Sequence, residues 1–406
     1  MQSPFIKPSV PVFTKPFASF NNNLINIAQI NPTPRELDLP RFVNYAGDLG
    51  GCGWWRILWP EYVLNTEGRA VCLTNTAMVL DPRWYAGVKA VRIQRQASGH
   101  QKEFIKFLKQ VQQQHGFRLI YDSDDVVFAE EIPDYNKFKF AFDTPEIRQN
   151  CIDIMNMCDE ITVSCEFMRK LYQEKTGKRE VTVVPNFIPH FWMGYQFNAK
   201  NVYESFDKNK RKPRVLYTGS AAHYDVDHKN NGVDDFSHVL STVINTVDKY
   251  QWVFVGAFPL QLMDLVNQKK IEFHPWQSLL RYPTLIANLN VQAMIAPLMD
   301  NNFNRCKSDI KFIEACSLGI PCLVQDMETY KNAPDVLKFK TGDELEAKLD
   351  MILNWKNRSK YYKNVDVLRS FAFQRYLEHP QNIDCHMEVL TTPYGSPERK
   401  NLSRYN

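Results

Sequence analysis

Short apolar runs alternate with longer stretches of helical periodicity along most of this 406-residue chain. The short runs are rich in Val, Ile and Leu and are bounded by turn residues, a pattern typical of buried parallel strands. We expect strands at residues 41–45, 69–73, 90–94, 118–121, 159–164, 181–188, 213–220, 251–256, 270–274, 291–298 and 322–325. The longer stretches predict helices at 101–115, 165–175, 308–318, 344–355 and 361–376. Strands that alternate with helices place the chain in the α/β class.

Changes in this pattern divide the chain into two Rossmann-like domains. A chain of this length and apolar content can bury two cores of ordinary size. We expect an extended arm (1–40), a first domain (41–197), a Lys-rich linker (198–212), a second domain (213–355), helices that brace the first domain (356–390) and a polar tail that frays (391–406).

Composition excludes several classes of protein. No apolar run is long enough to cross a membrane and no secretory leader is evident, so we expect neither a membrane span nor a signal peptide. The nine cysteines include no Cys-x-x-Cys pair, which favours a reduced, cytoplasmic chain without a zinc site. A net charge of +4 supports nucleic-acid binding only if basic residues gather on one face. The sequence does not indicate an oligomeric state.

A phosphate site is predicted where the strand at 291–298 leads into the helix at 308–318. Ser308 or Asp309 can cap this helix, whose first N–H groups and positive dipole end attract anions. Lys307 stands just before the helix and Lys311 one turn inside it. Glu314 lies further along and can accept hydrogen bonds from a ribose or sugar hydroxyl pair. The alternative is an ordinary capped helix with solvated lysines and Glu314 in a surface ion pair.

A second phosphate-binding turn is predicted after the strand at 213–220, which ends in Gly219 and Ser220. Lys229 follows on the same loop and is our candidate for a diphosphate clamp. The loop also carries a cluster of His and Asp side chains at His223, Asp225, Asp227 and His228. These residue types ligate divalent metals, but a loop is a poor cage, so we favour a site without metal.

A glycine-rich turn at 47–53 follows the first strand. Gly51 and Gly53 permit a tight turn and the close approach of a ligand. Arg56 follows two tryptophans and would suit a phosphate or acceptor contact. The alternative is a helix that packs its tryptophan face into the sheet.

Three carboxylates stand at the end of the strand at 118–121, namely Asp122, Asp124 and Asp125. This edge is where doubly wound sheets bind ligands, and the mutual repulsion of the acids is tolerated more readily if a cationic or hydroxylated group docks there. We therefore expect Asp124 or Asp125 near the reacting hydroxyl or sugar. The alternative is a set of solvated turn acids.

Lysines and aromatic residues interleave between Tyr135 and Phe142. Lys137 and Lys139 could follow a phosphate backbone while the aromatic rings stack on bases. The alternative, which such a pattern more often indicates, is an amphipathic helix with its aromatic rings in the core.

Two segments resemble GT-B glycosyltransferases. Lys-Ser-Asp-Ile-Lys-Phe-Ile-Glu-Ala at 307–315, followed by Gly-Ile-Pro at 319–321, is similar to their donor helix. Val-Val-Pro-Asn at 183–186 is similar to their crossing between domains. In much of that superfamily a second Glu precedes the first by eight positions, whereas this chain has Cys306 there.

The resemblance implies two Rossmann-like domains that face a central cleft, a UDP-sugar donor, and no metal or other cofactor. It places the nucleotide-sugar at Gly51, Gly53, Gly219, Ser220, Lys229, His274, Trp276, Lys307, Ser308, Lys311 and Glu314. It places the nucleobase near His274 and Trp276, although a tryptophan at such a position is more often a core residue. Asp124 and Asp125 are the implied catalytic acids. Acceptor contacts are expected from Arg56, Asp122, Lys137 and Lys139.

The acceptor is left open between several classes. Tyr-Asp-Ser-Asp-Asp at 121–125 resembles a run in bacteriophage glycosyltransferases. We therefore favour transfer of a sugar, with arabinose as one candidate, to 5-hydroxymethylcytosine in double-stranded DNA in the host cytoplasm. The alternatives are a bacterial envelope or polysaccharide glycosyltransferase and a non-catalytic nucleotide-binding module. Retention or inversion at the sugar carbon is not decided by the sequence.

Overall fold

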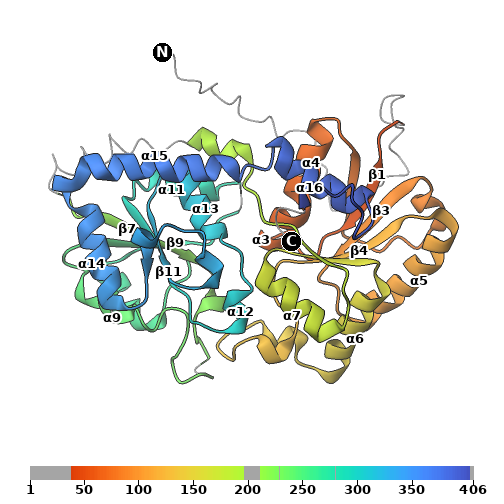
Figure 1. The fold of residues 1–406 in the computed structure, drawn as a ribbon. Coiled ribbons are helices and arrows are strands. Elements are labelled where there is room, and N and C mark those ends of the chain that lie inside the picture. The colour runs from red at the N-terminus through yellow and green to blue at the C-terminus, as the bar shows by residue number, and fades with distance from the viewer. Residues whose placement is uncertain (1–37, 196–210, 228, 279, 403–406) are drawn as a thin grey trace, which may run out of the picture.

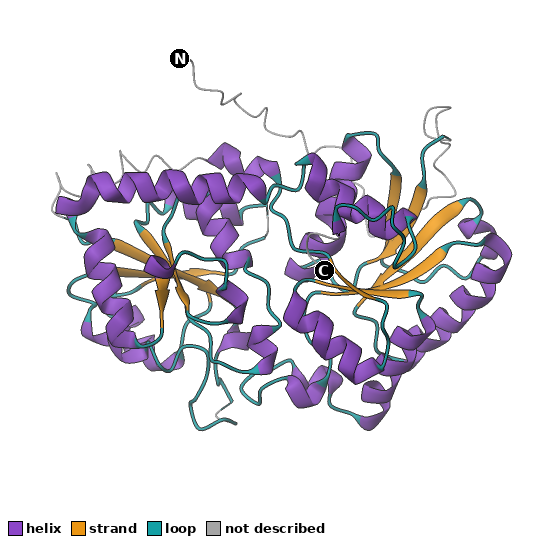
Figure 2. Cartoon of the chain, in the orientation of Figure 1, coloured by secondary structure: helices purple, strands orange, loops and turns teal. Residues whose placement is uncertain are grey.

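The computed structural model describes residues 38–195 and 211–402, apart from 228 and 279. It shows two parallel sheets of six strands, each with helices on both faces (Figures 1 and 2). The strand orders are β2-β1-β3-β4-β5-β6 and β12-β11-β10-β7-β8-β9. The predicted α/β class with two Rossmann-like domains is confirmed. The expected arm at 1–40 and linker at 198–212 lie almost wholly outside the described residues.

The first sheet is made by β1 (Arg41–Tyr45), β2 (Val71–Asn75), β3 (Val88–Gln94), β4 (Arg118–Ser123), β5 (Glu160–Val163) and β6 (Val181–Val183). Its helices are α3 (Gly51–Gly53), the π-helical turn η2 (Trp54–Leu58), α4 (Trp59–Thr66), α5 (Gly99–His115), α6 (Pro145–Met157) and α7 (Glu166–Thr176). Local sequence fixes α5 at both ends: Ser98 and Gln101 form a capping box, and Gly116 ends the helix in the left-handed conformation.

The second sheet is made by β7 (Arg214–Gly219), β8 (Gln251–Gly256), β9 (Glu272–Pro275), β10 (Ala293–Ala296), β11 (Cys322–Gln325) and β12 (Lys338–Phe339). Its helices are α9 (Leu240–Asn245), α10 (Met263–Asn267), α11 (Tyr282–Asn288), α12 (Asn302–Arg305), α13 (Ile310–Ser317) and α14 (Gly342–Leu353). Each expected strand is present. The two-residue β12 is too short to leave a periodic signal in the sequence.

The last two helices serve different domains. Helix α15 (Arg358–Gln374) packs on α13 and α14 of the second domain, whereas α16 (Pro380–Thr391) packs on α4 and β3 of the first (Figure 1). Between them the backbone at Leu377 donates to the carbonyl of Ile188. The expectation that residues 356–390 brace the first domain is therefore corrected for α15, which packs on the second domain. No helix in the described part of the chain is long and apolar enough to cross a membrane.

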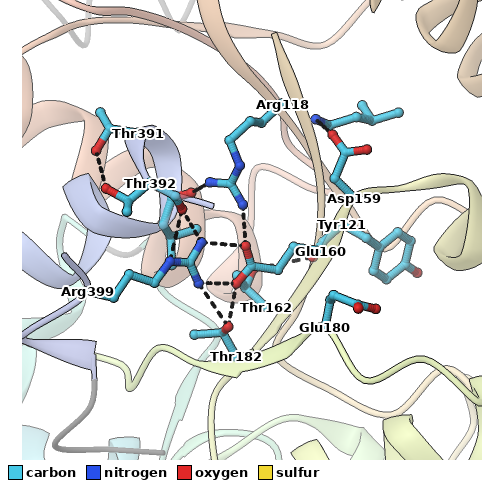
Figure 3. A network of polar contacts seen from close by, with 12 residues as sticks. Arg118, Tyr121, Asp159, Glu160, Thr162, Glu180, Thr182, Thr391, Thr392 and Arg399 are labelled. Atoms are coloured by element: carbon cyan, nitrogen blue, oxygen red, sulfur yellow. Dashed lines mark hydrogen bonds and ion pairs between the residues drawn. The ribbon is translucent and has the colours of Figure 1, made fainter. Parts of the chain in front are cut away.

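The C-terminal tail is held in place as far as Leu402, so the prediction that it frays is wrong for residues 391–402. Arg399 donates both terminal nitrogens to the buried carboxylate of Glu160 on β5, at 2.5 and 2.6 Å (Figure 3). Arg118 also bonds this carboxylate. A buried carboxylate is costly without such partners, and this one draws the tail onto the sheet.

We predict that Arg399→Ala lowers the free energy of unfolding by about 3 kcal/mol, because Glu160 would keep only Arg118 to neutralise its buried charge. Urea denaturation measures the change. The matched control is Arg83→Ala, which removes an exposed ion pair with Asp81 and should leave the urea midpoint almost unchanged. Equal effects of the two substitutions would contradict an anchoring role for Arg399.

Candidate functional site

A cavity of about 220 Å³ lies between the domains at the carboxyl ends of the second sheet. The first domain contributes Gly51 and Trp55, and the second contributes Thr218, Gly219, Ser220, His223, Val255, Gly256, Trp276, Gln277, Tyr282, Ile310, Lys311 and Glu314. This is the position at which open α/β sheets bind ligands. Six of the predicted nucleotide-sugar residues, Gly51 among them, thus meet in one cavity.

Glycines are required where backbone segments of this site approach each other. A β-carbon at Gly256 would lie 2.4 Å from the carbonyl oxygen of Gly219, and Gly256 also has a φ of +99°. In the turn after β1, a β-carbon at Gly53 would lie 1.8 Å from the carbonyl oxygen of Asp48. A larger residue at Gly256 would push the cavity wall apart, whereas one at Gly53, which does not line the cavity, would disrupt the turn that carries Gly51.

Lys311, on the first turn of α13, is the cation of this cavity. Its ammonium lies 3.4 Å from Nε2 of His223 and 4.9 Å from the centre of the Tyr217 ring. Burial lowers the pKa of Lys311 to about 8, and the positive charge of Lys307 acts in the same direction. A cation with few hydrogen bonds from the protein is well placed to pair with a phosphate.

Lys229, our predicted clamp, takes a different position. Its side chain is 64% exposed and pairs with Asp227 at 3.5 Å, and it does not line the cavity. The neighbouring Asp225 accepts backbone hydrogen bonds from Lys229, Asn230 and Gly232 and so shapes the loop. Among the described residues no group of three or more His, Cys, Asp and Glu side chains could hold a metal ion, and His228 is not described.

Glu314 is buried at the cavity wall, which contradicts the alternative of a surface ion pair. The hydroxyl of Tyr282 donates to Glu314 Oε2 at 3.2 Å. Burial raises the pKa of Glu314 to about 8, although Tyr282 and Lys311 oppose this rise. The carboxyl group is thus close to its titration point at neutral pH and can either donate or accept a hydrogen bond.

The residues before α13 bind the rest of the protein rather than capping the helix. Ser308 Oγ accepts a hydrogen bond from Asn186 at 2.8 Å, and Asp309 pairs with Arg375 at 2.9 Å. Asp309, the N-cap residue, makes no side-chain cap, so the expected cap by Ser308 or Asp309 is not formed. Lys307 and Ser308 line a second cavity of about 260 Å³, whose wall also includes Cys165 and Pro185.

Trp276 is 62% exposed and lines the first cavity, so the alternative of a core residue is wrong. Its indole edge lies against Gly256. His274 instead pairs with Glu272 at 2.7 Å, and Glu272 pairs with Arg214 at 2.8 Å. Of the described residues in this turn, Trp276 and Gln277 reach the cavity, whereas His274 does not.

Arg56 and Asp122 are buried together and are not available to an acceptor. Both side chains are 1% exposed, and two hydrogen bonds of 2.9 and 3.0 Å join the guanidinium to the carboxylate. Thr162 donates to the same carboxylate. The expected acceptor contacts of these two residues are therefore corrected to an internal ion pair. No local pattern around Arg56 indicates that its side chain turns inward.

Asp124 lies in a different environment from Asp122. Its Oδ1 is buried and has no hydrogen-bond partner among the described residues, and the nearest cation is Arg95 Nη1 at 3.8 Å. Burial raises the pKa of Asp124 to about 6, and Arg95 opposes the rise. Such a carboxylate is suited to accept a proton near neutral pH. Burial also raises the pKa of Asp125, against the charge of Lys307.

Sequence reasoning missed Arg95, which follows β3 with a φ of +49°, a conformation that side chains other than Gly rarely adopt. Its Nη1 also donates to Cys52 Sγ at 3.0 Å, in the glycine-rich turn. A single arginine after a strand carries no signal of this role. Sequence reasoning also missed the contact of Tyr282 with Glu314 and the pairing of His223 with Asp235.

The Lys-aromatic segment lies at the junction of the domains. It forms a short 3-10 turn, η5 (Lys139–Phe142), with Phe138 and Phe140 50% and 74% exposed, so the alternative of a core helix is wrong. Lys137 lies 5.1 Å above the Phe138 ring, whereas Lys139 pairs with Asp134 at 2.7 Å. Tyr135 fixes the start of the segment to the second domain by donating to Asp235 at 2.7 Å.

No family model and no curated protein matches the sequence. Solved structures do match it. Anabaena HepE in complex with UDP has a TM-score of 0.59 at 10% identity, covering 87% of this chain and 100% of that one. A glycosyltransferase from Rickettsia africae has a TM-score of 0.56 at 12% identity, and the match covers 87% of this chain and 100% of that one. T4 phage BGT in complex with its UDP-glucose substrate has a TM-score of 0.50 at 9% identity, and the match covers 87% of this chain and 99% of that one. These likenesses confirm the predicted GT-B fold.

Proposed function

We propose that this chain is a glycosyltransferase that moves a sugar from a UDP-sugar to an acceptor hydroxyl. The observation that carries the proposal is the interdomain cavity, where Lys311, Glu314 and the Gly219–Ser220 turn meet at the carboxyl end of a parallel sheet. The similar structures of HepE and BGT support it, because they are complexes with UDP and UDP-glucose.

In this proposal each wall of the cavity binds one part of the donor. The backbone after β7 and the uncapped start of α13 face the diphosphate, together with Lys311. Glu314 bonds a hydroxyl pair of the ribose or sugar, and Trp276 lies beside the nucleobase. The leaving UDP gains negative charge, which a fixed cation and helix dipole stabilise in the transition state. We propose that these groups suffice without a metal.

The chemical step needs an acceptor oxygen at the sugar. That oxygen attacks the anomeric carbon, the bond from this carbon to the diphosphate breaks, and the acceptor proton passes to a base. We propose Asp124 as that base, with Asp125 as the second candidate. The arrangement of Asp124, whose Oδ1 lacks a partner in the described residues, leaves a lone pair for this proton.

For the acceptor we propose 5-hydroxymethylcytosine in double-stranded DNA, with arabinose as one candidate sugar. Phe138 and Phe140 are exposed close to Lys137, three and five residues after Tyr135, which bonds Asp235 of the second domain. Exposed aromatic rings can stack on bases, and an ammonium group can pair with a phosphate. A base in a duplex would have to be flipped to reach the cavity.

We expect Lys311→Met to weaken binding of a UDP-sugar about 10- to 100-fold, because it removes a charged hydrogen-bond donor from the cavity. Glu314→Gln should weaken it less, since an amide keeps part of the hydrogen bonding. Titration calorimetry measures both. Lys229→Met is the matched control, because Lys229 is exposed outside the cavity. Equal affinities for wild type and Lys311→Met would reject this donor site.

We expect Asp124→Asn to lower kcat by about 100-fold or more with little change in UDP-sugar affinity, since a base acts in the transition state. In the wild type with saturating UDP-sugar, kcat/KM for the acceptor should rise with pH through about 6, where Asp124 loses its proton, and fall about tenfold per pH unit below that value. Asp125→Asn is the comparison. Parallel losses of turnover and affinity would assign Asp124 a structural role.

The acceptor is tested by mass spectrometry of nucleosides from hydroxymethylcytosine DNA after incubation with the chain and a panel of UDP-sugars. A pentose or hexose added to that nucleoside is the expected result. Lys137→Glu combined with Lys139→Glu should reduce this transfer and its salt dependence, while slow hydrolysis of the UDP-sugar in water persists. No added mass with any donor, together with transfer to a saccharide, would move the acceptor to the envelope class.

A further inference from the structure

His223 is part of the wall of the cavity between the domains, which is the donor cavity of the proposed function. It ends the short turn η7 (Ala221–His223), directly after the Gly219–Ser220 turn. Its ring lines the donor cavity. Nδ1 lies 2.7 Å from Asp235 Oδ2, and Nε2 lies 3.4 Å from the ammonium of Lys311. The imidazole therefore stands between a buried carboxylate and the cation of the cavity.

The contacts of Asp235 decide which ring nitrogen carries the hydrogen. Its Oδ1 accepts hydrogen bonds from the Tyr135 hydroxyl, the Met299 backbone and the Asn304 amide, at 2.7, 3.0 and 2.5 Å. Although burial acts in the opposite direction, the bond from His223 holds the pKa of Asp235 at about 2. A carboxylate can only accept, so Nδ1 of His223 donates. A neutral imidazole then has a bare lone pair at Nε2.

Without a ligand, His223 is neutral. Burial lowers its pKa to about 3, and the charges of Lys311 and Lys307 act in the same direction. A lone pair at Nε2 suits the Lys311 ammonium, but it would repel the oxygens of a phosphate placed in the same cavity.

We propose that His223 takes up a proton from solvent when a UDP-sugar binds, and then donates from Nε2 to the diphosphate while Asp235 holds the imidazolium at Nδ1. This inference rests on the proposed function and adds to it a second cation for the diphosphate, which exists only when the donor is bound. Both ring nitrogens of an imidazolium are donors, so the lone pair that opposes binding becomes a hydrogen bond that favours it.

The charge of the ligand is sufficient for this change. One unit charge at about 4 Å, at the effective dielectric of a protein site, moves a pKa by about three pH units. A UDP-sugar brings two negative charges, and they also offset Lys311 and Lys307, the two cations that disfavour the imidazolium. Asp235 faces the ring from the other side and favours it.

Calorimetry with UDP-glucose at about pH 6.5, in two buffers of different ionisation enthalpy, measures the proton directly. UDP-glucose is preferred to UDP because both of its phosphates are diesters with a fixed charge in this range. At this pH, Lys311 already holds its proton, as does Glu314, because the pKa of each is about 8. We expect uptake of up to about one proton per chain, and an affinity that falls by up to about tenfold per pH unit as pH rises.

Variants assign the proton to a residue. His223→Gln keeps a polar side chain and should bind UDP-glucose more weakly without proton uptake. The control is His238→Gln, which changes a partly buried histidine that contacts Gln325 at 2.7 Å and does not line the cavity. It should keep the uptake of the wild type. Glu314→Gln and Asp124→Asn exclude the two carboxyl groups of the proposed site whose pKa values, about 8 and about 6, lie on either side of this pH.

The outcomes separate this inference from the proposed function. Binding by the wild type without proton uptake overturns the inference and leaves the proposed donor intact. Uptake that persists in His223→Gln also overturns it, because another group then takes the proton. Absence of binding for every UDP-sugar of a panel overturns the proposed function itself.

Discussion

The hydrogen bonds of Asn186 join the parts of the molecule that have to meet at the cavity. Its side-chain oxygen accepts from Arg56 of the first domain at 3.0 Å, and its amide donates to Ser308 of the second at 2.8 Å. Its carbonyl accepts from Arg375, which also pairs with Asp309 at the start of α13. This buried junction thus helps to set the orientation of α13 relative to the first domain and the width of the cavity between them.

The same junction explains why two neighbouring acids have different roles. The carboxylate of Asp122 pairs with the guanidinium of Arg56, which also donates a hydrogen bond to the side-chain oxygen of Asn186. These short contacts have a structural role. Asp124, two residues later, faces Arg95 at 3.8 Å and keeps a buried oxygen without a partner among the described residues. A satisfied buried ion pair contributes to the architecture, whereas an incompletely satisfied carboxylate has a raised pKa and a free lone pair.

A second series of buried polar contacts joins the two domains beside the proposed donor cavity. Lys311, His223 and Asp235 form a row that ends at Tyr135 of the first domain. Binding of an anion at Lys311 would therefore change the charge of a group that is linked to the opposite domain. The exposed segment with Phe138 and Phe140 begins three residues after Tyr135. Donor binding and the proposed acceptor surface are thus connected through short polar contacts.

Local sequence determined much of this protein. Apolar runs located the strands, and helical periodicity located α5 and α13, because these signals arise between residues close in the chain. The roles of Gly219, Ser220, Lys311 and Glu314 as cavity residues followed from their place at strand ends and on one helix.

Tertiary structure alone decided which polar side chains turn inward. Lys229 and Lys311 are equally good cations in the sequence, yet only Lys311 lines the cavity. Arg56 pairs with a residue 66 positions away, and Arg399 with one 239 positions away. The partner of a buried charge is chosen by the packing of distant segments, because burial makes an unpaired charge costly wherever it lies in the chain. That choice leaves no local pattern, so only the fold determined which polar side chains are buried and which residues they pair with.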